Sequence, residues 1–434
     1  MPVPMVCLDV RLRQFAAVFR DCFSKPQHKY LVTVLLALML CQEPRTLSGL
    51  LRQVADGPTL SGMSRFLSEA PWSAEAVAGA WLARFRHQMG SLVEAEHKRQ
   101  RLLRPKRRGR PQATVVTGYL IGDDSTLYKR RGEKMGGLGV HYSTTEGRCV
   151  PGHSLVLGLY VLLGRRCPLP PRMYRQKTVC QAEGVPFQSK IDLMEECIGT
   201  FQPVPGTLTH VLLDSWYTTK RIWRTARQRH FHITSGLKSN RSLRVEDTTQ
   251  PRDWRWQKLS DYAAGLTAQD YHLITWPNQE GERQVHVHVV STRVRKLYRC
   301  QVVVVRESLE APLSEARYWA SSDLEADVVT LVGHMATRWD IEVLFGDSKD
   351  LLGLDQYQLM SAPAIVRFWT LVMAAYVFLD EERDRLSRER QRHTTIGDAR
   401  REIQRIHRRH LIHWIHEQFQ AGFLPQHLYE RLAA

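Results

Sequence analysis

The chain has 434 residues, with 61 Lys and Arg against 44 Asp and Glu, so its formal net charge is +17. Hydrophobic residues make up 43% of the sequence, which is enough for folded cores and excludes a wholly disordered chain. A positive excess of this size favours a polyanionic partner such as nucleic acid. A ribosome-associated or membrane-surface protein would show the same balance, so charge alone does not identify the partner.

The cysteines and the apolar runs give the expected compartment. The 8 cysteines are scattered, without a C-x2-C pair or a Cys/His cluster at zinc spacing, as in a cytosolic protein with reduced thiols. The longest apolar run, residues 31–41, is too short to span a bilayer and is interpreted as a core helix. We therefore predict a cytoplasmic, nucleoid-associated protein with no membrane partner.

Residues 1–97 are predicted to form a helical DNA-binding domain. Three apolar runs separated by turn residues predict helices, at residues 31–40, 47–54 and 61–67. Short helices joined by tight turns are compatible with a helix-turn-helix domain. A small helical bundle that never touches DNA is the alternative.

A basic linker is predicted at residues 98–113. Its segment Arg108-Gly109-Arg110-Pro111 is similar to an AT-hook, in which Arg-Gly-Arg enters a narrow A·T-rich minor groove. The alternative, which we favour, is a solvated basic tether, because a four-residue match is easily met in an Arg-rich chain. In either interpretation Arg108 and Arg110 are predicted to strengthen DNA binding in a salt-dependent way.

Two apolar runs in the middle of the chain end on acidic residues. Residues 115–121 precede Asp123 and Asp124, and residues 210–213 precede Asp214. Both runs predict short buried strands that finish on an acid at the edge of a sheet. A buried carboxylate is costly unless it is paired or binds metal, which favours a ligand role. The alternative for each aspartate is a cap on the following helix.

A third acid lies in the segment from Arg338 to Lys349. If this segment is helical, Arg338, Glu342, Phe345 and Lys349 share one helix face at i, i+4, i+7 and i+11. A carboxylate can hold a divalent cation, while Arg and Lys can bind phosphate oxygens on either side of it. The alternative is a salt-bridged surface helix.

Two strand acids followed by a helix acid are the order that a two-metal nuclease needs. We predict that Asp124, Asp214 and Glu342 hold two Mg²⁺ ions, with Mn²⁺ as a substitute and Asp123 as the alternative first acid. Such a site activates water or a 3′-hydroxyl and stabilises the leaving oxygen at phosphorus. Arg130, which follows the first acid closely, is predicted to contact the DNA backbone.

The chain resembles the DDE transposases of bacterial insertion sequences, in the IS4/IS701-like branch. Asp124-Ser125-Thr126 is similar to the D-x-T form of that family's first acid, and Asp214-Ser215-Trp216-Tyr217 to the segment of the second. Arg338, Glu342 and Lys349 fit the R-x3-E-x6-K part of the third signature, with Met335 in place of its Tyr. The resemblance covers roughly residues 115–368.

The resemblance implies an α/β fold with an RNase H-like mixed-sheet catalytic core at residues 114–380. The many arginines of residues 381–434 predict a basic helical region, which either contacts DNA or a partner protomer or is a solvated charged helix. Between Asp214 and Glu342 the chain is longer than a minimal core, and a β-rich insertion is predicted at about 243–322. Its strand character lies at residues 271–275, 285–290 and 298–305. Trp254, Trp256 and Trp276 are candidates for stacking on a flipped base, with insertion core as their alternative.

The implied function is that of a DNA transposase. It would bind the terminal inverted repeats of its element, cleave at the boundary, and join the 3′-hydroxyl ends to target DNA, as a homodimer on DNA. Arg338 and Lys349 would bind the phosphates beside the scissile bond. Two alternatives stay open: a domesticated transposase that only binds DNA, and a tyrosine nuclease using His230-Phe231-His232 or His286-Val287-His288 for metal.

Overall fold

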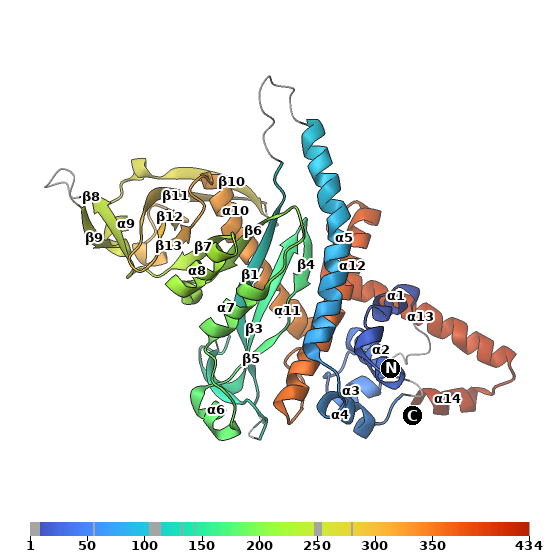
Figure 1. Ribbon diagram of the computed structural model, residues 1–434. Helices are drawn as coiled ribbons and strands as arrows, with labels where there is room; N and C mark the ends of the chain where they lie inside the picture. The colour runs from blue at the N-terminus through green and yellow to red at the C-terminus, as the bar shows by residue number, and fades with distance from the viewer. Residues whose placement is uncertain are drawn as a thin grey trace. The chain divides into compact units, whose positions relative to one another are not determined.

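The computed structural model describes residues 9–54, 57–103, 114–130, 132, 134–143, 145–246, 254–278 and 281–433. The chain divides into two compact units (Figure 1). Unit 1 comprises Met1–Leu92, Asp124–Lys190 and Glu342–Ala434, and unit 2 comprises Val93–Asp123 and Ile191–Ile341. The sequence suggested four consecutive parts, at residues 1–97, 98–113, 114–380 and 381–434, whereas the two units are each made of separate segments. The functions assigned to the four parts stay predictions.

The N-terminal part of unit 1 is helical. Its helices are α1 (Val10–Ala17), α2 (Lys25–Leu40), α3 (Leu47–Leu51), α4 (Leu60–Ser68) and α5 (Ala74–Leu103), with the 3-10 turn η1 (Arg20–Cys22). Polar residues start several of them: Ser24 forms a capping box with Gln27, and Thr59 accepts a hydrogen bond from Gly62 N. Helix α5 continues to Leu103, so the beginning of the predicted linker is helical. Arg108 and Arg110 lie outside the described residues.

Helix α12 (Ala362–Arg390) is the core helix of unit 1, followed by α13 (Ile396–Gln420) and α14 (Pro425–Ala433). By length and composition α12 could cross a membrane, yet 83% of its apolar window is buried, as in the core helix of a soluble protein. The ring of Trp369 lies 6.2 Å from that of His153 in β3, so the helix packs on the strands of unit 1. The predicted boundary at residue 380 falls inside this one helix.

The strands of unit 1 are arranged around β3 (Arg148–Leu162). It pairs antiparallel with β2 (Gly139–Ser143), β4 (Arg165–Pro168) and β5 (Arg172–Tyr174). The second half of β1 (Thr117–Tyr128) approaches it so closely that a Cβ on Gly152 would lie 2.5 Å from Leu127 O. Helix α6 (Lys177–Glu183) follows in unit 1, and α7 (Lys190–Thr200) begins at Lys190 and otherwise belongs to unit 2.

Unit 2 contains a mixed sheet of seven strands in the order β10-β11-β12-β13-β7-β6-β1. Their bounds are β6 (Leu208–Leu213), β7 (His232–Leu237), β10 (His272–Asn278), β11 (Gly281–Arg293), β12 (Arg299–Arg306) and β13 (Arg317–Ser321). Pairing is parallel from β1 through β6 to β7 and antiparallel from β7 to β10. The three strands predicted for the insertion are confirmed as β10, β11 and β12.

Further elements of unit 2 flank this sheet. They are α8 (Lys220–Gln228), α9 (Leu259–Ala264), α10 (Val328–Arg338), the start of α11 (Asp340–Leu352), the ribbon β8 (Ser242–Glu246) and β9 (Trp254–Lys258), and the turns η2 (Ser215–Tyr217), η3 (Ala268–Asp270) and η4 (Leu313–Glu315). Parallel pairing of β1, β6 and β7, together with the antiparallel β7–β13 pair, makes this sheet mixed. The predicted α/β mixed-sheet class is confirmed.

Candidate active site

Helix α10 packs on one face of the unit 2 sheet. Leu331 and Val332 join an apolar cluster with valines of β11 and β12. On the same side, the His334 ring lies 3.9 Å from that of His210 in β6 and 5.6 Å from that of Tyr119 in β1. Because side chains alternate along a strand, odd-numbered residues of β1 and even-numbered residues of β6 face α10.

The strand register puts Asp123 and Asp214 side by side on that face. Pairing of β1 with β6 ends with Gly122 opposite Leu213, so the two aspartates are the next residues on neighbouring strands. Asp214 keeps an extended backbone, with φ −73° and ψ 166°, so the alternation continues through it. Neighbouring strands lie roughly 4.8 Å apart, which brings both carboxylates within reach of a shared cation.

Arg338 faces the same part of the sheet, one helix turn after His334. Its Nη1 lies 3.5 Å from Asp123 Oδ2, and its guanidinium carbon lies 6.0 Å from the ring centroid of Trp319 in β13. The Arg338 and Asp123 side chains are 13% and 21% exposed, so the ion pair is shielded but reachable from solvent. Trp319 was not singled out from the sequence, because an aromatic residue in a strand carries no motif.

Asp124 points to the opposite face of the sheet, towards α7. Its Oδ2 lies 2.5 Å from Lys190 Nζ. Gly122, on the same face of β1, is packed so tightly that an added Cβ would lie 2.4 Å from Met194 Sδ. The sequence interpretation placed Asp123 and Asp124 at the end of a strand, which is wrong, because β1 continues to Tyr128. Asp214 directly follows β6, as predicted.

The segment around the third acid is helical, but the single helix predicted for Arg338 to Lys349 is interrupted, because α10 ends at Arg338 and α11 begins at Asp340. Glu342 belongs to unit 1 and stands one helix turn beyond Arg338 along the chain. Lys349 lies in the last turn of α11, where burial lowers the pKa of its ammonium group. Arg130 is exposed in a turn after β1.

Met335, at the position of the family's Tyr, has a structural role. It packs against the apolar cluster formed by α10, β11 and β12. Asp214 precedes the turn η2, and within the described chain its side chain makes no capping hydrogen bond, so the cap interpretation is not supported. Beside it, Tyr217 is fully buried, while Trp216 is 60% exposed with Lys238 Nζ 5.2 Å from its ring centroid.

The donor set on the α10 face suits a hard divalent cation. Carboxylate oxygens are the ligands that Mg²⁺ and Mn²⁺ prefer, and Asp123 and Asp214 both supply them on this face, whereas Glu342 belongs to unit 1. Among the residues that the structure describes, no three His, Cys, Asp or Glu side chains gather closely enough to hold a metal ion. The donor chemistry fits the predicted ions, and their number and arrangement stay a prediction.

The histidine pairs have other contacts. His288 Nε2 lies 2.9 Å from Tyr262 Oη, and its Nδ1 lies 2.9 Å from Asp270 O, so both ring nitrogens make hydrogen bonds within the fold. His232 stacks on His210, with ring centroids 5.7 Å apart. Trp254 and Trp256 are exposed on the ribbon β8–β9, and the Trp276 side chain lies outside the described residues.

The family follows from comparison with known sequences. The sequence model of the DDE superfamily endonucleases matches residues 18–296, which is more than half of the chain and includes Asp123 and Asp214. The chain belongs to this family. The predicted resemblance to DDE transposases is confirmed at the level of this DDE superfamily, while Arg338 and Glu342 lie beyond the matched residues.

Comparisons with curated proteins and with solved structures were also made. No functionally curated protein matches the sequence. Among solved structures, the chain is similar to a piggyBac transposase determined by cryo-EM in a synaptic complex with hairpin DNA, at 12% sequence identity and a TM-score of 0.41. The match covers 73% of this chain and 56% of that one, so the chain spans little more than half of that relative.

Proposed function

We propose that this DDE endonuclease is a DNA transposase whose three carboxylates are Asp123, Asp214 and Glu342. The observation that carries the proposal is the register of β1 and β6, which sets Asp123 beside Asp214 under Arg338. Asp124, the first choice from the D-x-T resemblance, becomes a positioning residue paired with Lys190. Membership in the DDE superfamily supports the endonuclease chemistry.

The proposed residues have distinct tasks. Asp123, Asp214 and Glu342 would hold two Mg²⁺ or Mn²⁺ ions, which when bound activate the attacking water or 3′-hydroxyl and neutralise charge at the scissile phosphate. Arg338 balances Asp123 before DNA arrives and then donates hydrogen bonds to a phosphate oxygen beside the scissile bond. Lys349 and Arg130 extend this cationic surface along the DNA backbone.

The proposed substrate is double-stranded DNA at the two ends of the protein's own element, followed by target DNA. The net charge of +17 supports a polyanionic substrate. Arg108 and Arg110 add salt-dependent affinity from the linker. We further propose that two copies act together on paired ends, in the bacterial cytoplasm at the nucleoid, because both ends must be cut for the element to move.

The test is a cleavage assay with purified protein and duplex DNA carrying the element's ends, in Mg²⁺ or EDTA. Nicks at the element boundary that leave a 3′-hydroxyl, need Mg²⁺ and vanish in Asp214→Asn support the proposal. Glu315→Gln, an exposed acid of the same unit, is the matched control and should cleave normally. Cleavage by Asp214→Asn at the wild-type rate contradicts it.

The domesticated transposase remains the second candidate function. Binding of the ends without cleavage, in both the wild type and Asp214→Asn and with either Mg²⁺ or Mn²⁺, would favour it. A covalent protein–DNA adduct would instead favour the tyrosine nuclease.

A further inference from the structure

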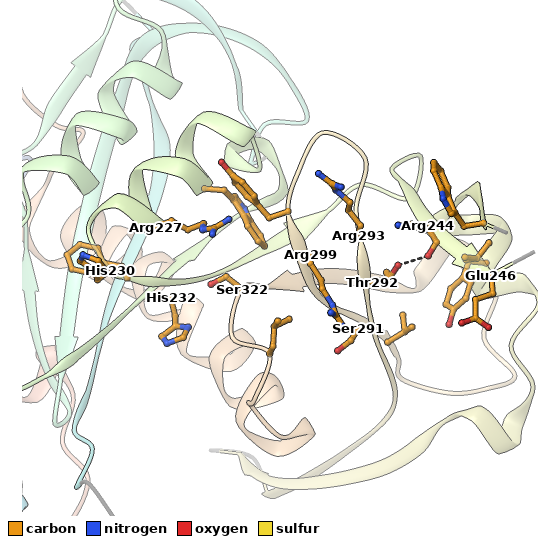
Figure 2. Close-up of a pocket in the computed structure, with 18 residues that line it drawn as sticks. Arg227, His230, His232, Arg244, Glu246, Ser291, Thr292, Arg293, Arg299 and Ser322 are labelled. Carbon is orange, nitrogen blue, oxygen red and sulfur yellow. Dashed lines mark hydrogen bonds between the residues drawn. The ribbon is translucent and has the colours of Figure 1, made fainter. Parts of the chain in front are cut away.

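Unit 2 contains a pocket of about 1590 Å³ away from the proposed carboxylates (Figure 2). Its wall is formed by helix α8, the ribbon β8–β9, and the ends of β7, β11 and β12. These residues are spread over a long stretch of the chain, so no sequence motif indicates the pocket.

Four arginines from four different elements line the pocket: Arg227 of α8, Arg244 of β8, Arg293 of β11 and Arg299 of β12. Figure 2 shows their side chains around the cavity. All four residues are exposed, and no described carboxylate lies within ion-pair distance of their guanidinium groups. The lining contains one acid, Glu246. Positive charge concentrated in a concavity, with four arginines against one acid in its lining, favours an anionic ligand.

Two of these arginines lie over aromatic rings. The guanidinium carbon of Arg227 is 4.3 Å from the ring centroid of Tyr298, and that of Arg244 is 4.4 Å from the ring centroid of Trp254. Trp254 remains 44% exposed and meets Trp256 edge-on, with centroids 5.5 Å apart. A guanidinium held against a ring is preorganised for phosphate, and an exposed indole offers a stacking surface for a base.

The pocket's size selects among anionic ligands. Small-molecule pockets usually measure about 300–1,000 Å³, so this one has room for more than a single mononucleotide. A double helix is too wide to enter a pocket, whereas an extended single strand can thread through one. Cations interleaved with aromatic rings are the surface that binds single-stranded nucleic acid without sequence preference.

This pocket is a different place from the α10 face at Asp214. One lining residue, His232 of β7, pairs with His210 in the register of β6 and β7. Asp214 follows His210 by four residues along β6, which corresponds to about 13 Å at the usual rise of a strand. The pocket opens at the beginning of β7, while the carboxylates stand at the end of β6.

We propose that this pocket binds a short stretch of single-stranded DNA. Arg227, Arg244, Arg293 and Arg299 bind its phosphates, and Trp254 stacks on a base. The proposal rests on the proposed function for its substrate class, because a transposase separates DNA strands when it cuts. In this proposal the unpaired DNA strand has a binding site that is separate from the carboxylates.

The experiment measures fluorescence anisotropy of a labelled oligothymidylate and of a labelled duplex with the full-length protein. Arg227→Gln/Arg244→Gln should bind the single strand at least tenfold more weakly. The log–log slope of affinity against salt should become shallower by roughly 0.7 for each phosphate that the variant no longer neutralises. Trp254→Ala should weaken single-strand binding without changing that slope. Arg255→Gln, on the same ribbon but outside the pocket lining, is the matched control.

Single-strand binding by the double variant within twofold of wild type overturns the proposal. Equal reductions in affinity for duplex and single strand overturn it too, because they indicate a general DNA surface. The cleavage assay keeps the two proposals apart. If the wild type never cleaves but the double variant binds the single strand more weakly, the pocket proposal is supported and the transposase proposal is rejected. If the wild type cleaves and the double variant binds the single strand as the wild type does, the transposase proposal is supported and the pocket proposal is rejected.

Discussion

Asp123 of β1 and Arg338 of α10 form an ion pair, with 3.5 Å between Oδ2 and Nη1. The next residue, Asp124, pairs with Lys190 on the other face of the same strand. Two adjacent acids therefore belong to different environments, because successive side chains of a strand point to opposite faces. Asp123 differs from Asp124 in lying on the same face of the sheet as Asp214, and the local D-x-T pattern does not reveal this difference.

Replacing Arg338 tests its proposed interaction with phosphate. Arg338→Gln should lower the single-turnover rate of end cleavage by roughly 100- to 1,000-fold, as expected for loss of a preorganised donor at a developing charge. Arg338→Lys should recover part of that rate, because it restores the charge without the forked geometry. Arg295→Gln, an exposed arginine of unit 2, is the control. Wild-type cleavage by Arg338→Gln would contradict the role.

The histidine cluster beneath α10 should make the fold sensitive to acid. Burial lowers the pKa of His334 from 6.5 to about 4, and burial also lowers the pKa of His210, beside it, well below its usual range. Between pH 6.5 and 4 these histidines are protonated in the unfolded chain but stay neutral in the folded chain, so the free energy of unfolding falls as the pH falls.

We expect His334 to contribute roughly 3 kcal/mol to that loss, at about 1.36 kcal/mol per pKa unit. Urea unfolding at pH 7 and pH 4.5 should show a smaller decrease for His334→Phe than for the wild type. The exposed His413→Phe is the control. Parallel pH profiles for wild type and His334→Phe would exclude this histidine as the cause.

Lys129 should produce a second pH window, on the alkaline side. Its Nζ donates hydrogen bonds to Asp355 O at 2.5 Å and Tyr357 O at 2.8 Å, and burial lowers its pKa from 10.5 to about 7. Between pH 7 and 10.5 the unfolded chain holds the extra proton, so stability rises with pH across this window.

Lys129→Met should be about 2 kcal/mol less stable at high pH, because two carbonyls lose their donor, and should lack the rise between pH 7 and pH 9. Denaturant unfolding at those two pH values measures both effects. Lys134→Met, at an exposed position, should keep the wild-type profile. A rise that persists in Lys129→Met would show that other groups cause it.

Local patterns predicted elements such as α2 and the strands β10, β11 and β12, because each depends on residues close together in sequence. They could not choose between Asp123 and Asp124, since that choice depends on the register of β1 with β6, which is distant along the chain. Likewise, Met335 packs in an apolar cluster whose members come from three elements. The basic pocket was missed for the same reason, because Arg227 of α8 and Arg299 of β12 line one pocket only after the chain has folded.

The most direct measurement compares Asp123→Asn with Asp124→Asn in the Mg²⁺-dependent end-cleavage assay, with binding of the ends measured in parallel. The account predicts that Asp123→Asn loses at least roughly 100-fold in cleavage rate while still binding the ends. It predicts that Asp124→Asn, which loses only a partly exposed ion pair, stays within about tenfold of wild type. Full cleavage by Asp123→Asn together with an inactive, folded Asp124→Asn would contradict it.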